Sequence, residues 1–326
     1  MRTLLQTLRS VRNFVTSTAM DIQVSELFVP VPWGEIRGRV WGPDHGRPVL
    51  CLHGWADNCG AFSTLIPLLP KECRYVAIDL AGHGRSSHRP LGDFYSLPTY
   101  VADVRRVADA LQLRKFSIIG HSMGGDIAGM FSALYPEMVD ALVILDAYGF
   151  FPTDLKELSK AMRQGMDEIL QFEKKTGQER VYTYEKAAER LLAANPTLSE
   201  QSVRILLERG LVQVEGGFVF SRDLRVNFKY ILLNTLEQSL VMQSKIQASV
   251  LVVLAEEGFD KIFSEPATRK FCPTLLQGFQ DRNDTVARVP GDHHVHLNKP
   301  EVVAPLVSDF LRTKVLPRPN TREHKL

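Results

Sequence analysis

Phe116-Ser-Ile-Ile-Gly-His-Ser-Met-Gly-Gly125 is the stretch that decides the fold of this chain. It opens as an apolar, β-branched run, which predicts a buried strand. It ends in a sharp G-x-S-x-G turn centred on Ser122, and a segment of helical character, residues 126–134, follows. Strand, turn and helix are the setting in which this motif exposes a serine hydroxyl. Gly120 and Gly124 carry no Cβ and leave the room that a strained turn needs.

The helix expected behind Ser122 indicates chemistry at its hydroxyl. Backbone N–H groups at a helix N-terminus carry a partial positive charge that stabilises developing negative charge. A serine hydroxyl is a weak nucleophile, so it needs a base within hydrogen-bond distance and an acid that orients the base. The sequence therefore predicts Ser122 as a nucleophile and requires a histidine and a carboxylate elsewhere.

Three histidines compete for the role of general base, and all lie in the loop of residues 290–300, before the predicted last helix over 300–313. A glycine two residues before His293 and a proline seven residues after it favour His293. His294 and His296 remain alternatives. A zinc site built from the three would lack a Cys or carboxylate cluster at ligand spacing, so we expect neither a metal nor a cofactor.

An oxyanion hole needs two backbone donors. One is expected from Met123, the residue after the nucleophile. The other is expected from the loop after the predicted strand 47–53, where Gly54 permits a turn that faces the Trp55 N–H inward. The alternative is that His53-Gly54 only ends a strand. We predict the amides of Trp55 and Met123 as the two donors.

The acid is the least defined member of the site. Asp146 ends the predicted strand 141–146, although a strand-end aspartate also commonly caps a turn. The next predicted strand, 249–254, is followed by further carboxylates, which are Glu256, Glu257 and Asp260. Asp146 is the first candidate and Asp260 the second, with the two glutamates left open.

The composition is typical of a globular protein. The 326 residues are 44% hydrophobic and 23% charged, and the formal net charge of +2 is too small to suggest nucleic acid as a partner. The four cysteines show no C-x-x-C spacing and indicate reduced thiols in an intracellular protein. No apolar run approaches the roughly 18–20 residues of a membrane span. Oligomeric state does not follow from the sequence.

Strands and helices alternate along most of the chain, which predicts a mostly parallel sheet covered on both faces. This alternation stops over about 100 residues, where three helical faces follow one another without a buried strand. We therefore expect a core of 21–147 and 246–313, a helical cap of 148–245, an N-terminal extension of 1–20 and a C-terminal tail of 314–326.

The two ends of the chain carry candidate targeting signals. Residues 1–20 hold three arginines, several Ser and Thr and no acid, which suits a mitochondrial transit peptide, and Met20 offers a second start. The ending His324-Lys325-Leu326 resembles the peroxisomal Ser-Lys-Leu signal with an unusual first residue. We expect cytoplasmic or peroxisomal placement, with the mitochondrion as the alternative.

The motifs together resemble the α/β-hydrolase fold superfamily, and within it the chain is similar to the serine hydrolase-like protein group. The match covers about residues 24–313 and rests on Cys51–Asn58, Asp79–Ser86, Gly120–Gly125, Gly216–Asp223 and Gly291–Pro300. The resemblance implies an eight-stranded, mostly parallel sheet flanked by helices, a helical cap, and esterase-type chemistry without a cofactor. Gly258 departs from the superfamily, which usually has its acid at this position.

We therefore expect a serine hydrolase that acts on a small hydrophobic acyl substrate, an ester or a thioester, through an acyl-enzyme. Two alternatives stay open at this point. One is carbon–carbon bond hydrolysis by the same three residues. The other is a non-catalytic, ligand-binding protein on a hydrolase fold, which the irregular acid position suggests.

Overall fold

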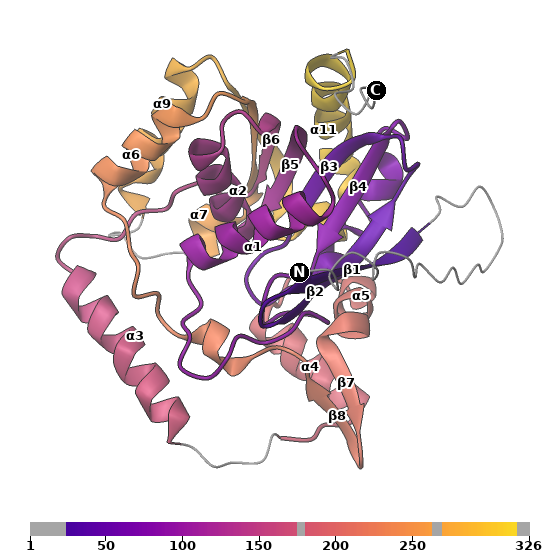
Figure 1. Cartoon of the computed structure of the whole chain (residues 1–326), viewed down its shortest axis with the longest axis vertical. Helices are drawn as coiled ribbons and strands as arrows, with labels where there is room; N and C mark the ends of the chain where they lie inside the picture. The colour runs from indigo at the N-terminus through magenta and orange to yellow at the C-terminus, as the bar shows by residue number, and fades with distance from the viewer. Residues whose placement is uncertain (1–23, 175–179, 263–268, 318–326) are drawn as a thin grey trace, which may run out of the picture.

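An eight-stranded sheet forms the centre of the computed structural model, which describes residues 24–174, 180–262 and 269–317 (Figure 1). The strand order is β1-β2-β4-β3-β5-β6-β9-β10. The strands are β1 (Val24–Val31), β2 (Gly34–Trp41), β3 (Arg47–Leu52), β4 (Cys73–Ile78), β5 (Phe116–His121), β6 (Val139–Leu145), β9 (Ser249–Glu257) and β10 (Thr285–Asp292). β2 is antiparallel to both of its neighbours, and all other pairings are parallel.

The central strands are buried on both faces, which is why they read as continuous apolar runs. Every residue of β5 and β6 is buried, and β3 is buried after its first residue. β1 shows the alternation of an edge strand with one face toward water. The prediction of a mostly parallel sheet is confirmed.

Helices cover the two faces of the sheet in separate layers. One hydrophobic cluster joins the sheet to α1 (Leu97–Ala110), α2 (Met123–Leu134), α6 (Leu236–Lys245) and α9 (Cys272–Asp281). A second cluster on the opposite face joins it to α11 (Pro300–Lys314) and to the short 3-10 helices η1 (Cys59–Phe62) and η2 (Ile66–Leu68). Among the described helices, none is both long enough and apolar enough to cross a membrane.

A mainly helical segment is inserted between β6 and β9. It contains α3 (Leu158–Glu173), α4 (Tyr184–Ala194), α5 (Glu200–Gly210), the hairpin β7 (Leu211–Val214) and β8 (Gly217–Phe220), and η3 (Leu224–Asn227). We call α3 to η3 the cap. The helix α6 falls within the range 148–245 but packs against α2 and α9 with the flanking helices. The candidate targeting signals, residues 1–20 and His324–Leu326, lie outside the described residues.

Candidate active site

Four neighbouring strands end at one edge of the sheet and bring the candidate residues together. Ser122 follows β5, Asp146 follows β6, Gly258 follows β9 and His293 follows β10. These strands are adjacent and parallel in the order β5-β6-β9-β10. The carboxyl ends of parallel strands are where open α/β sheets place their ligand sites.

Ser122 lies in the strained turn that its motif predicts. Its φ of 50° and ψ of −123° belong to no regular element, and its N–H donates to the carbonyl of Leu145 on β6 at 3.0 Å. A Cβ at Gly120 or Gly124 would overlap the carbonyl oxygens of Gly124 and Leu52, respectively. The two glycines are therefore needed for the close approach of α2 to β3 and β5.

His293 and Asp146 make a short buried contact. His293 Nδ1 lies 2.6 Å from Asp146 Oδ2, and the side chains are 11% and 2% exposed. A carboxylate at this distance holds the ring in the tautomer that carries its proton on Nδ1. The other ring nitrogen, Nε2, is then unprotonated and has the lone pair that a general base requires.

Asp146 is fixed by hydrogen bonds with the backbone of β9 and of the residues that follow it. Its own N–H donates to Val253 O at 2.7 Å, its Oδ1 accepts from the Ala255 N–H at 2.8 Å, and its Oδ2 accepts from the Phe259 N–H at 2.7 Å. Its φ of 48° is unusual for a residue other than glycine. Charge-assisted bonds of this kind stabilise the ionised carboxylate in one orientation.

Gly258 explains how the carboxylate of Asp146 fits. A Cβ built on Gly258 would overlap all three atoms of that carboxyl group. A side chain at position 258 and a carboxylate at position 146 therefore exclude each other. The glycine that departs from the superfamily pattern vacates the space that Asp146 occupies.

The other carboxylates considered for the acid have different partners. Asp260 accepts the hydroxyl hydrogen bond of Tyr148, and Glu257 pairs with Lys261 at the surface. Glu256 is exposed. The structure thus places Asp146, and neither Asp260 nor the glutamates, against His293.

The two other histidines of the loop are buried beside His293. His294 Nε2 lies 3.3 Å from Asp57 Oδ2. His296 is fully buried against Phe62 and His121, and burial lowers the pKa of His296 to about 3. Within the described ranges, no group of three or more His, Cys, Asp or Glu side chains is arranged to hold a metal ion.

The two candidate oxyanion donors lie at the start of α2 and on the loop after β3. Met123 is the first residue of α2, so its N–H has no partner within the helix. The Trp55 N–H donates to no other residue in the part of the chain that the structure describes. The Trp55 side chain points outward, where its indole donates to Val226 O at 2.8 Å. His53 serves the loop itself, because its Nε2 accepts from the Leu80 N–H at 2.9 Å.

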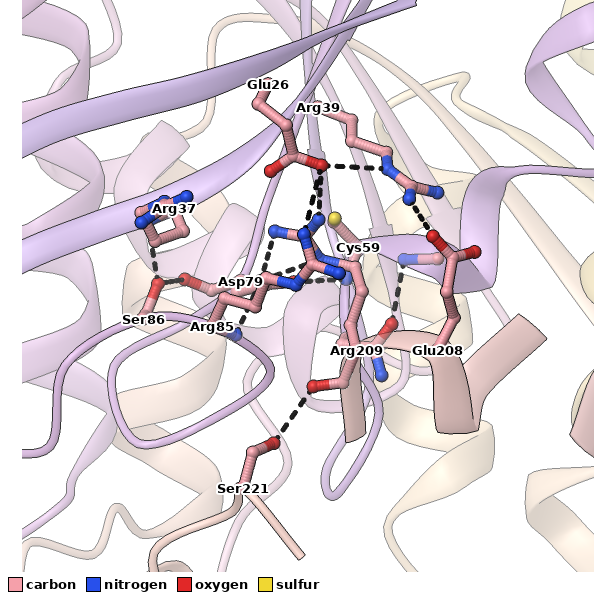
Figure 2. A network of polar contacts seen from close by, with 12 residues as sticks. Glu26, Arg37, Arg39, Cys59, Asp79, Arg85, Ser86, Glu208, Arg209 and Ser221 are labelled. Atoms are coloured by element: carbon pink, nitrogen blue, oxygen red, sulfur yellow. Dashed lines mark hydrogen bonds and ion pairs between the residues drawn. The ribbon is translucent and has the colours of Figure 1, made fainter. Parts of the chain in front are cut away.

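A buried arginine of the cap, which sequence reasoning missed, lies against the Asp79 turn (Figure 2). Arg209 of α5 is 1% exposed and contacts Asp79 Oδ2 through Nε at 2.9 Å and Nη2 at 2.8 Å, and Glu26 through Nη1 at 2.7 Å. Burial alone would raise the pKa of Asp79, but Arg209, together with the N–H groups of Arg85 and Cys59, outweighs burial and the pKa is lowered. Asp79 also holds its turn by accepting from the Arg85 N–H at 2.9 Å.

Helix α5 has two further anchors on loops of the site. The Asn58 amide, on the loop of Trp55, donates to Leu206 O at 2.8 Å. The side-chain oxygen of Asn298 accepts from the Ser202 hydroxyl at 2.7 Å. The side-chain nitrogen of Asn298 donates to the carboxylate of Asp292 at 3.0 Å, and Asp292 directly precedes His293. Pairs so distant in sequence leave no local pattern that would reveal them.

A partly buried acid near the nucleophile was also missed. Asp126 lies one turn along α2, and its N–H donates to Ser122 O at 3.2 Å. Its Oδ1 is buried without a hydrogen-bond partner in the described part of the chain. Burial raises the pKa of Asp126, and the Phe151 N–H opposes this only in part. Its position four residues after Ser122 on a predicted helix could have singled it out.

The chain matches a family model and several relatives. The model is described as the alpha/beta hydrolase fold and matches residues 47–195. A "Serine hydrolase-like protein" of Danio rerio is 55% identical over 93% of either chain. "Serine hydrolase-like protein 2" of Homo sapiens is 40% identical over 90% of this chain and 96% of the relative.

Solved structures show the same architecture. A hypothetical protein from Pseudomonas aeruginosa is 31% identical, with a TM-score of 0.78 over 88% of this chain and 99% of that one. A thioesterase domain from the curacin biosynthetic pathway is 26% identical, with a TM-score of 0.72 over 87% and 98% of the two chains. The predicted fold class is confirmed, and these likenesses support a hydrolase. The chain belongs to the serine hydrolase-like group of the α/β-hydrolase fold superfamily.

Proposed function

We propose that this protein hydrolyses a carboxylic ester or thioester through an acyl-enzyme formed on Ser122. The observation that carries the proposal is the 2.6 Å contact between His293 and Asp146 at the sheet edge where Ser122 occupies its strained turn. Nucleophile, base and orienting acid then follow three strands of one sheet. This is the set of groups that serine acyl transfer requires.

In the first half of the reaction, His293 Nε2 takes the proton of the Ser122 hydroxyl as its oxygen attacks the substrate carbonyl. Asp146 keeps the imidazole in the required tautomer and stabilises the imidazolium that forms. The amides of Met123 and Trp55 donate to the oxyanion. His293 then returns the proton to the leaving alkoxide or thiolate, and the acyl group stays on Ser122.

In the second half, His293 takes a proton from water, and the resulting hydroxide attacks the acyl carbonyl. Collapse of this intermediate returns the proton to Ser122 and releases the carboxylic acid. The similarity to a thioesterase domain supports a thioester as one substrate class. The Phe259 ring, with its centroid 6.2 Å from that of His293, favours an apolar acyl group over a charged one.

A fluorophosphonate probe tests the proposal without knowledge of the substrate. The wild-type protein is expected to be labelled once, at Ser122, and the Ser122→Ala variant is expected to resist labelling while keeping its melting temperature. A panel of acyl esters and thioesters then reports which bond is cleaved. Folded wild-type protein that is neither labelled nor active on the panel would favour the ligand-binding alternative.

The location of the acid is tested by moving it. Asp146→Gly should lower the labelling rate by about 10³–10⁴-fold, because His293 loses its orienting carboxylate. The double variant Asp146→Gly, Gly258→Asp should recover part of that loss, since the removed carboxylate leaves space for the new one. Asp260→Asn serves as the control and should label at the wild-type rate. An Asp146→Gly variant with an unchanged rate would show that another group is the acid.

A further inference from the structure

A second histidine–aspartate contact lies next to the first and has no role in the reaction described above. Asp57 belongs to the loop of residues 53–58 that carries Trp55, and His294 follows His293. Asp57 Oδ2 lies 3.3 Å from His294 Nε2, and the side chains are 6% and 7% exposed. The same oxygen lies 3.7 Å from His121 Nδ1. Neither contact has the alignment of a hydrogen bond, and the ion pair is formed between Asp57 and His294 alone.

Each member of the pair favours the charged form of the other. Burial alone would raise the pKa of Asp57, but the neighbouring imidazoles, His294 foremost, outweigh burial and the pKa falls to about 2. Burial alone would lower the pKa of His294, but the neighbouring carboxylates, Asp57 foremost, outweigh burial and the pKa is raised. The neighbouring rings stay neutral, because burial lowers the pKa of His121 and of His296.

Other charged groups face this pair from three sides. Asp292 accepts from the His294 N–H at 2.7 Å, and its carboxylate also favours the protonated imidazole. Asp146 does the same from the end of β6. Arg222 comes from the cap, with its guanidinium 5.5 Å from the Trp55 ring, and is attracted to Asp57.

Each member of the pair is joined directly to a part of the site. The Asp57 N–H donates to Gly54 O at 3.2 Å and closes a turn that contains Trp55. A Cβ at Gly54 would lie 2.8 Å from His121 Nδ1 and 3.2 Å from Asp57 Oδ2, so this turn packs tightly on the residue before Ser122. On the other loop, His121 Nε2 donates to His293 O at 2.8 Å.

We propose that the ion pair of Asp57 and His294 positions the Trp55 loop against the His293 loop, so that oxyanion donor and base meet the same substrate carbonyl. The inference rests on the function proposed for Ser122 and His293. Asp57 and His294 act as positioning residues. His294 does not replace His293 as the base, because its Nε2 is turned to Asp57.

A purely structural role and a positioning role predict different behaviour. Replacing both members of a buried ion pair by neutral groups often costs little stability, whereas removing one leaves an uncompensated charge. The His293 and His294 rings are 5.3 Å apart, so an uncompensated carboxylate on Asp57 also favours protonated His293. If the pair has a positioning role, removing one of its two charges should change the labelling rate and its pH dependence more than removing both.

The test compares fluorophosphonate labelling of Ser122 between about pH 5 and pH 9 in four variants. They are Asp57→Asn, His294→Gln, the double variant and the control His88→Gln, which removes a half-exposed histidine 3.6 Å from Asp223. Each single variant at the pair should label about tenfold more slowly than wild type. His294→Gln should also move the inflection of the pH profile upward. The double variant should regain both the rate and the inflection in part.

The results separate this inference from the proposed function. Wild-type protein that is not labelled, or a labelled Ser122→Ala variant, would overturn the proposed function itself. Single variants with the wild-type rate and inflection, or a double variant whose losses simply add, would overturn only the positioning role. If Asp57→Asn fails to fold, His294→Gln and the double variant, checked by melting temperature, carry the same comparison.

Discussion

Two helices of the cap, α5 and α3, attach to the molecule in opposite ways. Helix α5 inserts a fully buried arginine into the core and reaches three loops of the candidate site. Helix α3 buries only Gly165 and Ile169, while Met166 and Leu170 are 42% and 53% exposed. Figure 1 shows α3 at the edge of the molecule, apart from α4 and α5.

The difference teaches which part of the cap belongs to the site. Elements with few buried contacts open locally at a lower free energy than elements packed into the core. We therefore expect α5 to stay in place with the loops of Trp55 and His293. We expect α3 to be the part of the cap that moves when a substrate enters or a product leaves.

The strongest way to break this comparison is to remove the buried cation of α5. Arg209→Met leaves the carboxylate of Asp79 buried without its partner and should lower the free energy of unfolding in urea by about 3–5 kcal/mol. Arg204→Met, on the same helix, removes an exposed pair with Glu200 and should change it by less than about 0.5 kcal/mol. Equal effects of the two substitutions would contradict the role of Arg209 as an anchor.

A smaller effect is expected from the anchor nearest the base. Asn298→Ala removes the bonds to Ser202 and Asp292, which should cost about 1–3 kcal/mol in the free energy of unfolding. It should also slow fluorophosphonate labelling, because Asp292 lies next to His293. A variant that is less stable but labels at the wild-type rate would show that this anchor serves the fold alone.

The carboxyl group of Asp126 on α2 gives a prediction that depends on pH. Burial raises the pKa of Asp126, so the folded state holds this proton more tightly than the unfolded state does. The free energy of unfolding therefore falls as the pH rises above the pKa of the carboxyl group in the unfolded chain. Asp126→Asn keeps an acceptor for the Phe151 N–H but cannot ionise. Its melting temperature should exceed that of wild type by more at about pH 7.5 than at about pH 4.5. A constant difference would show that Asp126 does not titrate in this way.

The smallest effects are expected on α3. Met166→Ala and Leu170→Ala should each change the free energy of unfolding by no more than about 0.5 kcal/mol, because their side chains are exposed. Hydrogen exchange of the wild-type protein provides the sharper measurement. Backbone amides of α3 should exchange faster than those of α5. Equal protection of the two helices would contradict the distinction between them.

The sequence predicted the fold well because local patterns encode it. The apolar run of β5, the turn at Ser122 and the helix behind it are contiguous, and the periodicity of the other elements is equally local. The choice of Asp146 over Asp260 was not decided, because it depends on the space at Gly258, which only the pairing of β6 with β9 reveals. The partnership of Arg209 with Asp79 spans 130 residues and could not be read from either segment.

The shared space of Asp146 and Gly258 has a consequence for descent. A lineage that transfers the carboxylate from one strand to the other by single substitutions must pass through a protein with two overlapping side chains or with none. Both intermediates are expected to be impaired, so the two arrangements are separated by a fitness valley. Each arrangement, once established, is therefore expected to persist in its branch.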